Sequence, residues 1–118
     1  MAGRRVLLIE DDLISASALT AILSRRGFHV LHATTVAVGL ELLAEQPDTV
    51  ILDLMLPDGD GAAVLQHVRA AGLGVRVVVT TAVHEVARLA EVRALRPDHL
   101  MQKPIDLADL LNVLKPLN

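Results

Sequence analysis

The sequence predicts a single α/β domain in which helices cover both faces of a parallel, five-stranded sheet. Three short runs, residues 6–9, 49–52 and 75–79, are almost continuously apolar and rich in β-branched residues, a pattern typical of strands buried on both faces. Two weaker strand candidates, residues 28–32 and 99–102, contain polar side chains and are expected at the sheet edges. Segments with helical spacing separate these runs, so each connection is expected to be a right-handed crossover.

The helices are expected at residues 13–26, 35–45, 62–71, 84–95 and 106–114. In the first of them, one apolar face is predicted from Ile14, Ala18, Ala21 and Ile22, and Gly27 follows as a C-terminal stop signal. In the last, four leucines repeat at i, i+3, i+4 and i+7 and predict its buried face: Leu107, Leu110, Leu111 and Leu114.

Placing the two weaker strands at the edges gives the sheet order 2-1-3-4-5. The predicted fold is therefore a flavodoxin-like (βα)5 three-layer sandwich, formed as one domain by residues 1–118. In such a sheet, ligands bind outside the carboxyl ends of the strands, at the point between strands one and three where the strand order reverses. The residues that follow each strand are the candidates for a functional site.

Composition excludes several other classes of protein. The chain has no cysteine, which rules out disulfides and thiolate metal sites, and Phe28 is its only aromatic residue. Fourteen acidic and eleven basic residues give a net charge of −3 without a block of lysine or arginine, so direct nucleic-acid binding is not expected. The apolar run after Arg4 and Arg5 has four residues, too short for export or membrane insertion, and a cytoplasmic location is expected.

Polar side chains follow four of the predicted strands. Because the carboxyl ends of parallel strands meet at one edge of the sheet, we expect these side chains to converge. They are Glu10, Asp11, Asp53, Thr80, Thr81 and Lys103.

This set of residues suits phosphoryl transfer. Three crowded carboxylates repel one another by about 1–4 kcal/mol per pair at about 4 Å, so a divalent cation with oxygen ligands, Mg²⁺, is expected among them. Lys103 can pair with Asp53 or with phosphoryl oxygens. Asp53 is central among the strand ends and is the predicted nucleophile, which forms an acyl phosphate.

The sequence resembles the receiver domains of bacterial two-component response regulators, and the match covers nearly the whole chain. Its most specific part is Asp-Leu-Met-Leu-Pro-Asp-Gly-Asp-Gly at residues 53–61, which is similar to the family's phosphoacceptor strand end and following loop. The acidic strand end at residues 6–12, the pair Thr81-Ala82 and the pair Lys103-Pro104 are also similar to family motifs.

The resemblance implies a role for each matching residue. Asp11 and Asp53 would bind Mg²⁺ through their side chains, Glu10 mainly through a water on the metal, and Met55 through its backbone carbonyl. Asp12 falls outside this set and is interpreted as a solvated residue at the start of the first helix.

The same resemblance implies how the phosphorylated state is recognised. Thr81 matches the family's switch hydroxyl, Ala82 would leave room for the phosphoryl group, and Lys103 would bind it. The Lys103-Pro104 bond is expected to be cis, which would aim Lys103 into the pocket.

The implied partner is a sensor histidine kinase or a phosphotransfer protein that donates from phosphohistidine. Phosphorylation would then rearrange a surface formed by residues 84–95, 99–102 and 106–114, which could also form a homodimer. The chain would catalyse only its own phosphorylation and dephosphorylation, and it is not expected to be an enzyme otherwise.

Three positions depart from the family pattern. Leu100 replaces the tyrosine or phenylalanine common three residues before the lysine, so an altered output face is expected. Met55 and Val83 are apolar where polar side chains can orient a hydrolytic water, and slow spontaneous dephosphorylation is expected. The five histidines are scattered without metal-binding spacing and are interpreted as surface or edge residues.

Two other functions are compatible with parts of this pattern. A pseudo-receiver would keep the fold as a dimerisation or docking module; the complete pocket argues against this alternative, and Leu100 keeps it open. The other is a hydrolase with an aspartate nucleophile, related to phosphatases of similar fold; such enzymes typically use a second aspartate two residues after the first, where this chain has Met55.

Overall fold

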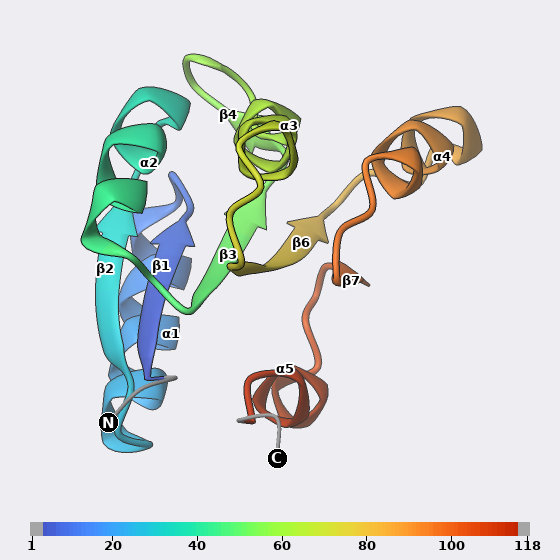
Figure 1. Ribbon diagram of the computed structural model, residues 1–118. Coiled ribbons are helices and arrows are strands. Elements are labelled where there is room, and N and C mark those ends of the chain that lie inside the picture. Colours follow the sequence, from blue (N-terminus) through green and yellow to red (C-terminus); the bar gives the residue numbers. More distant parts are fainter. Residues whose placement is uncertain (1–3, 116–118) are drawn as a thin grey trace.

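A computed structural model describes residues 4–115 of the chain, so the ends of the expected domain, residues 1–3 and 116–118, lie outside the described residues. Five strands form the main sheet and five α-helices connect or follow them (Figure 1). The strands are β1 (Arg5–Ile9), β2 (His29–Ala33), β3 (Thr49–Asp53), β6 (Arg76–Thr81) and β7 (His99–Gln102). The helices are α1 (Leu13–Arg25), α2 (Val36–Leu42), α3 (Ala62–Ala70), α4 (Val86–Ala94) and α5 (Leu107–Val113).

All pairs in the main sheet are parallel, and the strand order is β2-β1-β3-β6-β7. Numbered by the five main strands alone, this is the order 2-1-3-4-5, which confirms the predicted fold. Every residue of the central strand β3 is buried, whereas the edge strands β2 and β7 expose their polar residues. The apolar and polar patterns of the sequence therefore predicted strand positions correctly.

Two hydrophobic layers lie on opposite faces of the sheet. Alternate strand residues such as Leu7 and Leu52 pack with α2, α3 and α4, and residues such as Leu8 and Ile51 pack with α1 and α5. Both layers are aliphatic apart from Phe28, which lies under α1. The strands thus gain apolar burial on both faces, as a parallel sheet requires.

The predicted buried face of the first helix is wrong. Ile14 is 84% exposed, and the residues of α1 that reach the core are Ala16, Leu19 and Leu23. Apolar residues occur on several sides of α1, so spacing alone does not identify the face that meets the sheet. The predicted face of the last helix is mostly confirmed, because Leu110 and Leu114 are buried.

Several element boundaries also differ from the predictions. The predicted strand 75–79 extends to Thr81, because Thr80 pairs with Asp53 and Thr81 with Gln102. The predicted helix 35–45 tightens into a 3₁₀ turn at Leu43–Glu45. A short antiparallel hairpin, β4 (Met55–Leu56) and β5 (Gly59–Asp60), follows β3 where a turn was expected.

Among residues 4–115, no helix is long and apolar enough to cross a membrane. All five histidines are exposed, as predicted.

Candidate functional site

The carboxyl end of β3 places Asp53 at the centre of the candidate site. Asp53 is 6% exposed, and its strand is paired on both sides, with β1 and with β6. The preceding residues of β3 are buried in both hydrophobic layers. The position of this carboxylate is therefore determined by the most constrained part of the sheet.

Three carboxylates meet at this edge. Glu10, Asp11 and Asp53 each offer an oxygen atom, and these oxygens lie within 4.8 Å of one another. Oxygens bound to one Mg²⁺ at about 2.1 Å are at most about 4.2 Å apart, so small side-chain rotations would bring this donor set around such an ion. Asp11 is exposed, whereas Glu10 and Asp53 are buried, so the cluster is open to solvent on the Asp11 side.

Lys103 connects the two buried carboxylates. Its Nζ donates to Glu10 Oε1 at 2.8 Å and to Asp53 Oδ2 at 3.0 Å. Burial lowers the pKa of Lys103, but the hydrogen bonds from its ammonium to Glu10 and Asp53 outweigh this effect and raise the pKa. Lys103 is therefore a cation at neutral pH. The Lys103–Pro104 peptide bond is cis, as the family resemblance implies.

Burial has the opposite effect on the neighbouring acid. Removal from water raises the pKa of Glu10, and the hydrogen bonds from Lys103 and from the Asp12 backbone only partly offset this increase. A second positive charge, in addition to that of Lys103, would stabilise the ionised forms of all three carboxylates. Such a need for positive charge is expected of a cation site.

Asp12 belongs to α1 rather than to the carboxylate cluster. Its side chain accepts hydrogen bonds from the hydroxyl of Ser15 at 3.0 Å and from the backbone N–H of Ile14 at 3.1 Å. These hydrogen bonds lower the pKa of Asp12, and the one from the Ser15 hydroxyl has the largest effect. Asp12 thus caps the helix, which agrees with its interpretation from the sequence.

The two threonines at the end of β6 lie on opposite faces of the sheet. Thr80 lines a cavity of about 370 Å³ between α1 and α5. Thr81 is fully buried; its Oγ1 accepts a hydrogen bond from Val83 N at 2.9 Å, and its carbonyl oxygen accepts one from Lys103 N at 2.8 Å. Thr81 and Lys103 are therefore directly connected through the backbone, and the exposed Ala82 follows Thr81.

The β4–β5 hairpin starts directly beside Asp53. The backbone N–H of Met55 donates to Asp53 Oδ1 at 3.2 Å, and the Met55 side chain is 66% exposed. At the other end of the hairpin, Gly61 lies so close to the strand that a Cβ atom there would be 2.0 Å from the Asp53 carbonyl oxygen. The backbone around Asp53 is thus held from both ends of the hairpin.

Sequence reasoning missed three contacts of this hairpin. They are the packing of Gly61 on Asp53, the hydrogen bonds of Asp58 to the start of α2, and the ion pair of Asp60 with Arg88 on α4. Each of these contacts joins residues from different elements, and no local pattern marks the partners. The turn residues at 57–59 signalled only that the chain reverses here.

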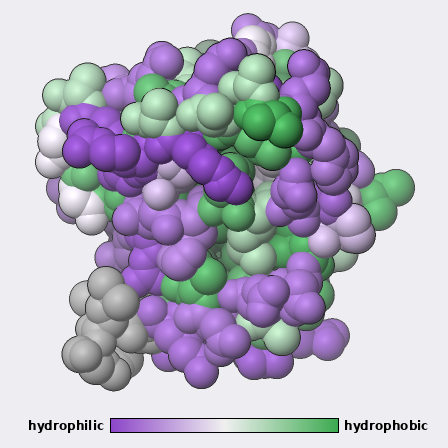
Figure 2. Space-filling model, turned by 90° about the vertical axis from the view of Figure 1, so that its right-hand side faces the viewer, coloured by the Kyte–Doolittle hydropathy of each residue, from purple (hydrophilic) through white to green (hydrophobic). Residues whose placement is uncertain are grey.

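Leu100 lies half-buried on β7 and packs against the hydrophobic layer that contains Val79 and Val92. Around it, the face formed by α4, β7 and α5 presents mostly hydrophilic residues with hydrophobic ones exposed between them (Figure 2). Val86, at the start of α4, is 83% exposed. Leu100 thus lies on the strand that precedes Lys103 and contributes neither a ring nor a hydroxyl to this face.

The geometry combines a buried carboxylate, a cation that contacts it and an oxygen-rich cluster open to solvent. A carboxylate oxygen in such a place can act as a nucleophile, and Lys103 can neutralise the charge on a transferred phosphoryl group. A bound divalent cation would supply further charge neutralisation at the same oxygens.

Comparison with known proteins places this site in a family. Residues 6–115 match the family model described as the response regulator receiver domain. The transcriptional regulatory protein QseB of Escherichia coli O157:H7 is 36% identical over 114 residues, which cover 96% of this chain and 52% of QseB. Sporulation initiation phosphotransferase F of Bacillus subtilis is 24% identical over 116 residues, which cover 98% of this chain and 94% of that protein.

A solved structure shows the same fold. It is a response regulator protein from Burkholderia pseudomallei with a phosphorylated aspartic acid, a calcium ion and citrate. The TM-score is 0.85 at 25% identity, and the alignment covers 95% of this chain and 66% of that one. The chain spans about half the length of the transcriptional regulators that it matches.

Proposed function

This chain belongs to the response regulator receiver domain family, and we propose that it accepts a phosphoryl group on Asp53 from the phosphohistidine of a sensor kinase or a phosphotransfer protein. Receiver domains of two-component response regulators are signalling switches, and phosphorylation-dependent switching is typical of them. The observation that carries the assignment to Asp53 is its position: a buried carboxylate at the carboxyl end of β3, in contact with Lys103 and beside Glu10 and Asp11.

The proposed reaction is a single displacement at phosphorus. An oxygen of Asp53 attacks, the P–O bond of the acyl phosphate forms, and the N–P bond to the donor histidine breaks, so that the imidazole leaves with the bonding electron pair. Lys103 then exchanges part of its contact with Asp53 Oδ2 for the phosphoryl oxygens. Thr81 and the small Ala82 lie where β6 ends and can accommodate this group.

We propose that Glu10, Asp11 and Asp53, together with the backbone carbonyl of Met55, hold Mg²⁺. The carboxylate cluster supports this assignment, because its oxygens lie close to the spacing that an octahedral ion requires. Bound there, the ion would neutralise charge on the phosphoryl oxygens. Lys103 would orient Asp53 and Glu10 in the absence of the donor.

We further propose that phosphorylation alters the face formed by α4, β7 and α5. Thr81 is connected to Lys103, which follows β7, through its backbone, and Arg88 on α4 pairs with Asp60 in the hairpin. One route thus leads from the pocket toward β7 and another toward α4. The homodimer on this face, the altered readout at Leu100 and the cytoplasmic location stay predictions. Neither the comparisons nor the described contacts favour the pseudo-receiver alternative.

The test is phosphorylation by acetyl phosphate in Mg²⁺, followed by intact mass. The native chain is expected to gain the mass of one phosphoryl group, and Asp53→Asn is expected to gain none. Omission of Mg²⁺ should prevent the gain in the native chain. A native chain that gains no mass, with no amide shifts on addition of beryllofluoride, would overturn the proposed function.

A further inference from the structure

The β4–β5 hairpin lies beyond the carboxyl end of β3, and its loop extends toward α2 (Figure 1). It starts two residues after Asp53 and is joined to the site by the hydrogen bond from Met55 N to Asp53 Oδ1. The position of the Met55 carbonyl, the proposed metal ligand, therefore depends on the position of the hairpin. The tip of the hairpin, Pro57 and Asp58, is exposed and does not contribute to either hydrophobic layer.

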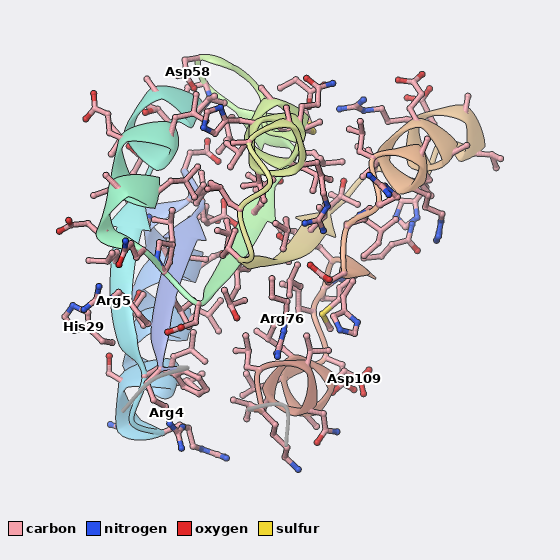
Figure 3. The ribbon with its side chains drawn as sticks, in the orientation of Figure 1. Arg4, Arg5, His29, Asp58, Arg76 and Asp109 are labelled. Carbon is pink, nitrogen blue, oxygen red and sulfur yellow. The ribbon has the colours of Figure 1, made fainter. Side chains whose placement is uncertain are left out.

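The carboxylate of Asp58 holds this tip on α2. Its Oδ1 accepts a hydrogen bond from Val36 N at 2.8 Å and its Oδ2 accepts one from Ala37 N at 3.0 Å. Figure 3 shows Asp58 at the end of the molecule where the hairpin reaches the start of α2. Both oxygens are thus bound to backbone groups more than twenty residues away in the sequence, and the bonds join two separate elements.

These bonds do more than satisfy the free N–H groups of a helix end. Helix α2 already has a local cap, because Thr35 Oγ1 accepts a hydrogen bond from Val38 N at 3.1 Å. Asp58 is charged at neutral pH, since its hydrogen bonds from Val36 and then from Ala37 lower its pKa. The distinctive consequence of the Asp58 contacts is that the hairpin cannot move independently of α2.

Helix α2 is itself a fixed support. Gly39 packs so closely on β1 that a Cβ atom there would lie 2.6 Å from Ile9 Cδ1. Ile9 directly precedes Glu10 and Asp11. The chain of contacts therefore runs from the hairpin through Asp58 to α2, and from α2 to the strand that carries the other two acids.

We infer that Asp58 is a positioning residue that sets the distance between the Met55 carbonyl and the acids of β1 at the value a divalent cation requires. This inference rests on the proposed function, because it assumes that the cation binds among these groups. Removing the Asp58 contacts frees the hairpin tip, so the Met55 carbonyl three residues away is held less firmly at the position that the cation requires. The expected effect is about a tenfold weaker Mg²⁺ affinity, the lower end of the range for residues that hold metal ligands in place.

The experiment compares Mg²⁺ dissociation constants, measured by titration of amide NMR shifts, for the native chain, Asp58→Ala and Thr35→Ala. Thr35→Ala is the matched control, because it removes a cap from the same helix without touching the hairpin. We expect the dissociation constant to rise about tenfold in Asp58→Ala and to change less than about twofold in Thr35→Ala. Asp58→Asn keeps one acceptor oxygen and is expected to lie between the native chain and Asp58→Ala.

The outcomes are distinguishable. If Asp58→Ala and Thr35→Ala weaken Mg²⁺ binding equally, Asp58 acts only as a cap of α2, and the inference is overturned. An unchanged Mg²⁺ dissociation constant in both variants would overturn it too. Loss of Mg²⁺ binding in the native chain would instead overturn the proposed function. Hydrogen exchange at the Val36 and Ala37 amides gives a second readout, because it should accelerate in Asp58→Ala only if the two hydrogen bonds exist in solution.

Discussion

Replacing Gly61 with alanine tests the geometry around Asp53 without removing any functional group. A Cβ atom at residue 61 would lie 2.0 Å from the Asp53 carbonyl oxygen and 3.0 Å from Leu54 Cα. Carbon and oxygen atoms in contact are normally about 3.3 Å or more apart, so the backbone must open by about 1.3 Å. Because β3 is fixed by its two neighbouring strands, the strain falls on the backbone between Asp53 and the hairpin.

The cost follows from these distances. Overpacking of a close contact destabilises a protein by about 1–3 kcal/mol, which at about 4 °C per kcal/mol for a chain of this size lowers Tm by about 4–12 °C. A displacement of about 1 Å at a reacting group can slow a reaction about 10²-fold. We therefore expect Gly61→Ala to be phosphorylated much more slowly than its loss of stability would explain.

Thermal unfolding and the rate of mass gain with acetyl phosphate measure the two effects. Gly74→Ala is the matched control, because a Cβ atom at residue 74 has no neighbour within 4 Å; its Tm and rate should stay close to native or its Tm should rise slightly. The rates are compared well below the Tm of both variants. Native rate and native Tm in Gly61→Ala would refute the assigned backbone geometry.

Three further predictions concern the hairpin and the pocket. The pKa of Asp58 in the folded chain is lowered from its ordinary value of 3.8, so its carboxylate stabilises the fold fully above pH 3.8, and this contribution is lost as the pH falls through the lowered pKa. The Tm difference between the native chain and Asp58→Asn should therefore shrink below pH 3.8. A Tm difference that stays constant over this pH range would contradict the assignment. Arg88→Ala breaks a half-exposed ion pair with Asp60 and should cost less than about 1 kcal/mol while reducing the amide shifts of α4 caused by beryllofluoride; Arg93→Ala, on the same helix, should leave those shifts unchanged, and equal effects would exclude the Asp60 route. Val83→Gln should shorten the acyl-phosphate lifetime, measured by loss of the phosphorylated mass, by about tenfold or more if a positioned side chain orients the attacking water, and an equally short lifetime in Val83→Leu would count against this account.

The sequence predicted that the polar side chains of the site converge at one edge of the sheet, because their positions depend on strand ends. Asp53 and Lys103 each lie at the end of a predicted strand, and the carboxyl ends of parallel strands converge by topology alone. The structure brings both residues into contact with Glu10, so the predicted cluster needed no knowledge of side-chain packing. Asp12 could be assigned to the helix start for a different reason, because a helix cap depends only on neighbours in the sequence.

The remaining features depend on contacts between distant segments. Asp58 and Val36 are separated by 22 residues, and their hydrogen bond exists because the hairpin reaches α2. The buried face of α1 was predicted incorrectly because Ile14 and Leu23 suggest different apolar faces, and only packing on the sheet selects the one with Leu23. Local patterns thus determine where side chains leave the sheet, whereas the supports of the site depend on how the connecting segments pack.

The most direct test of the central claim is to locate the phosphoryl group. After incubation with acetyl phosphate and Mg²⁺, borohydride reduces an aspartyl phosphate to homoserine, and peptide mass spectrometry identifies the converted residue. The account predicts homoserine at position 53 in the native chain and at no position in Asp53→Asn. Conversion at Asp11, Asp58 or another carboxylate, with Asp53 unchanged, would contradict it.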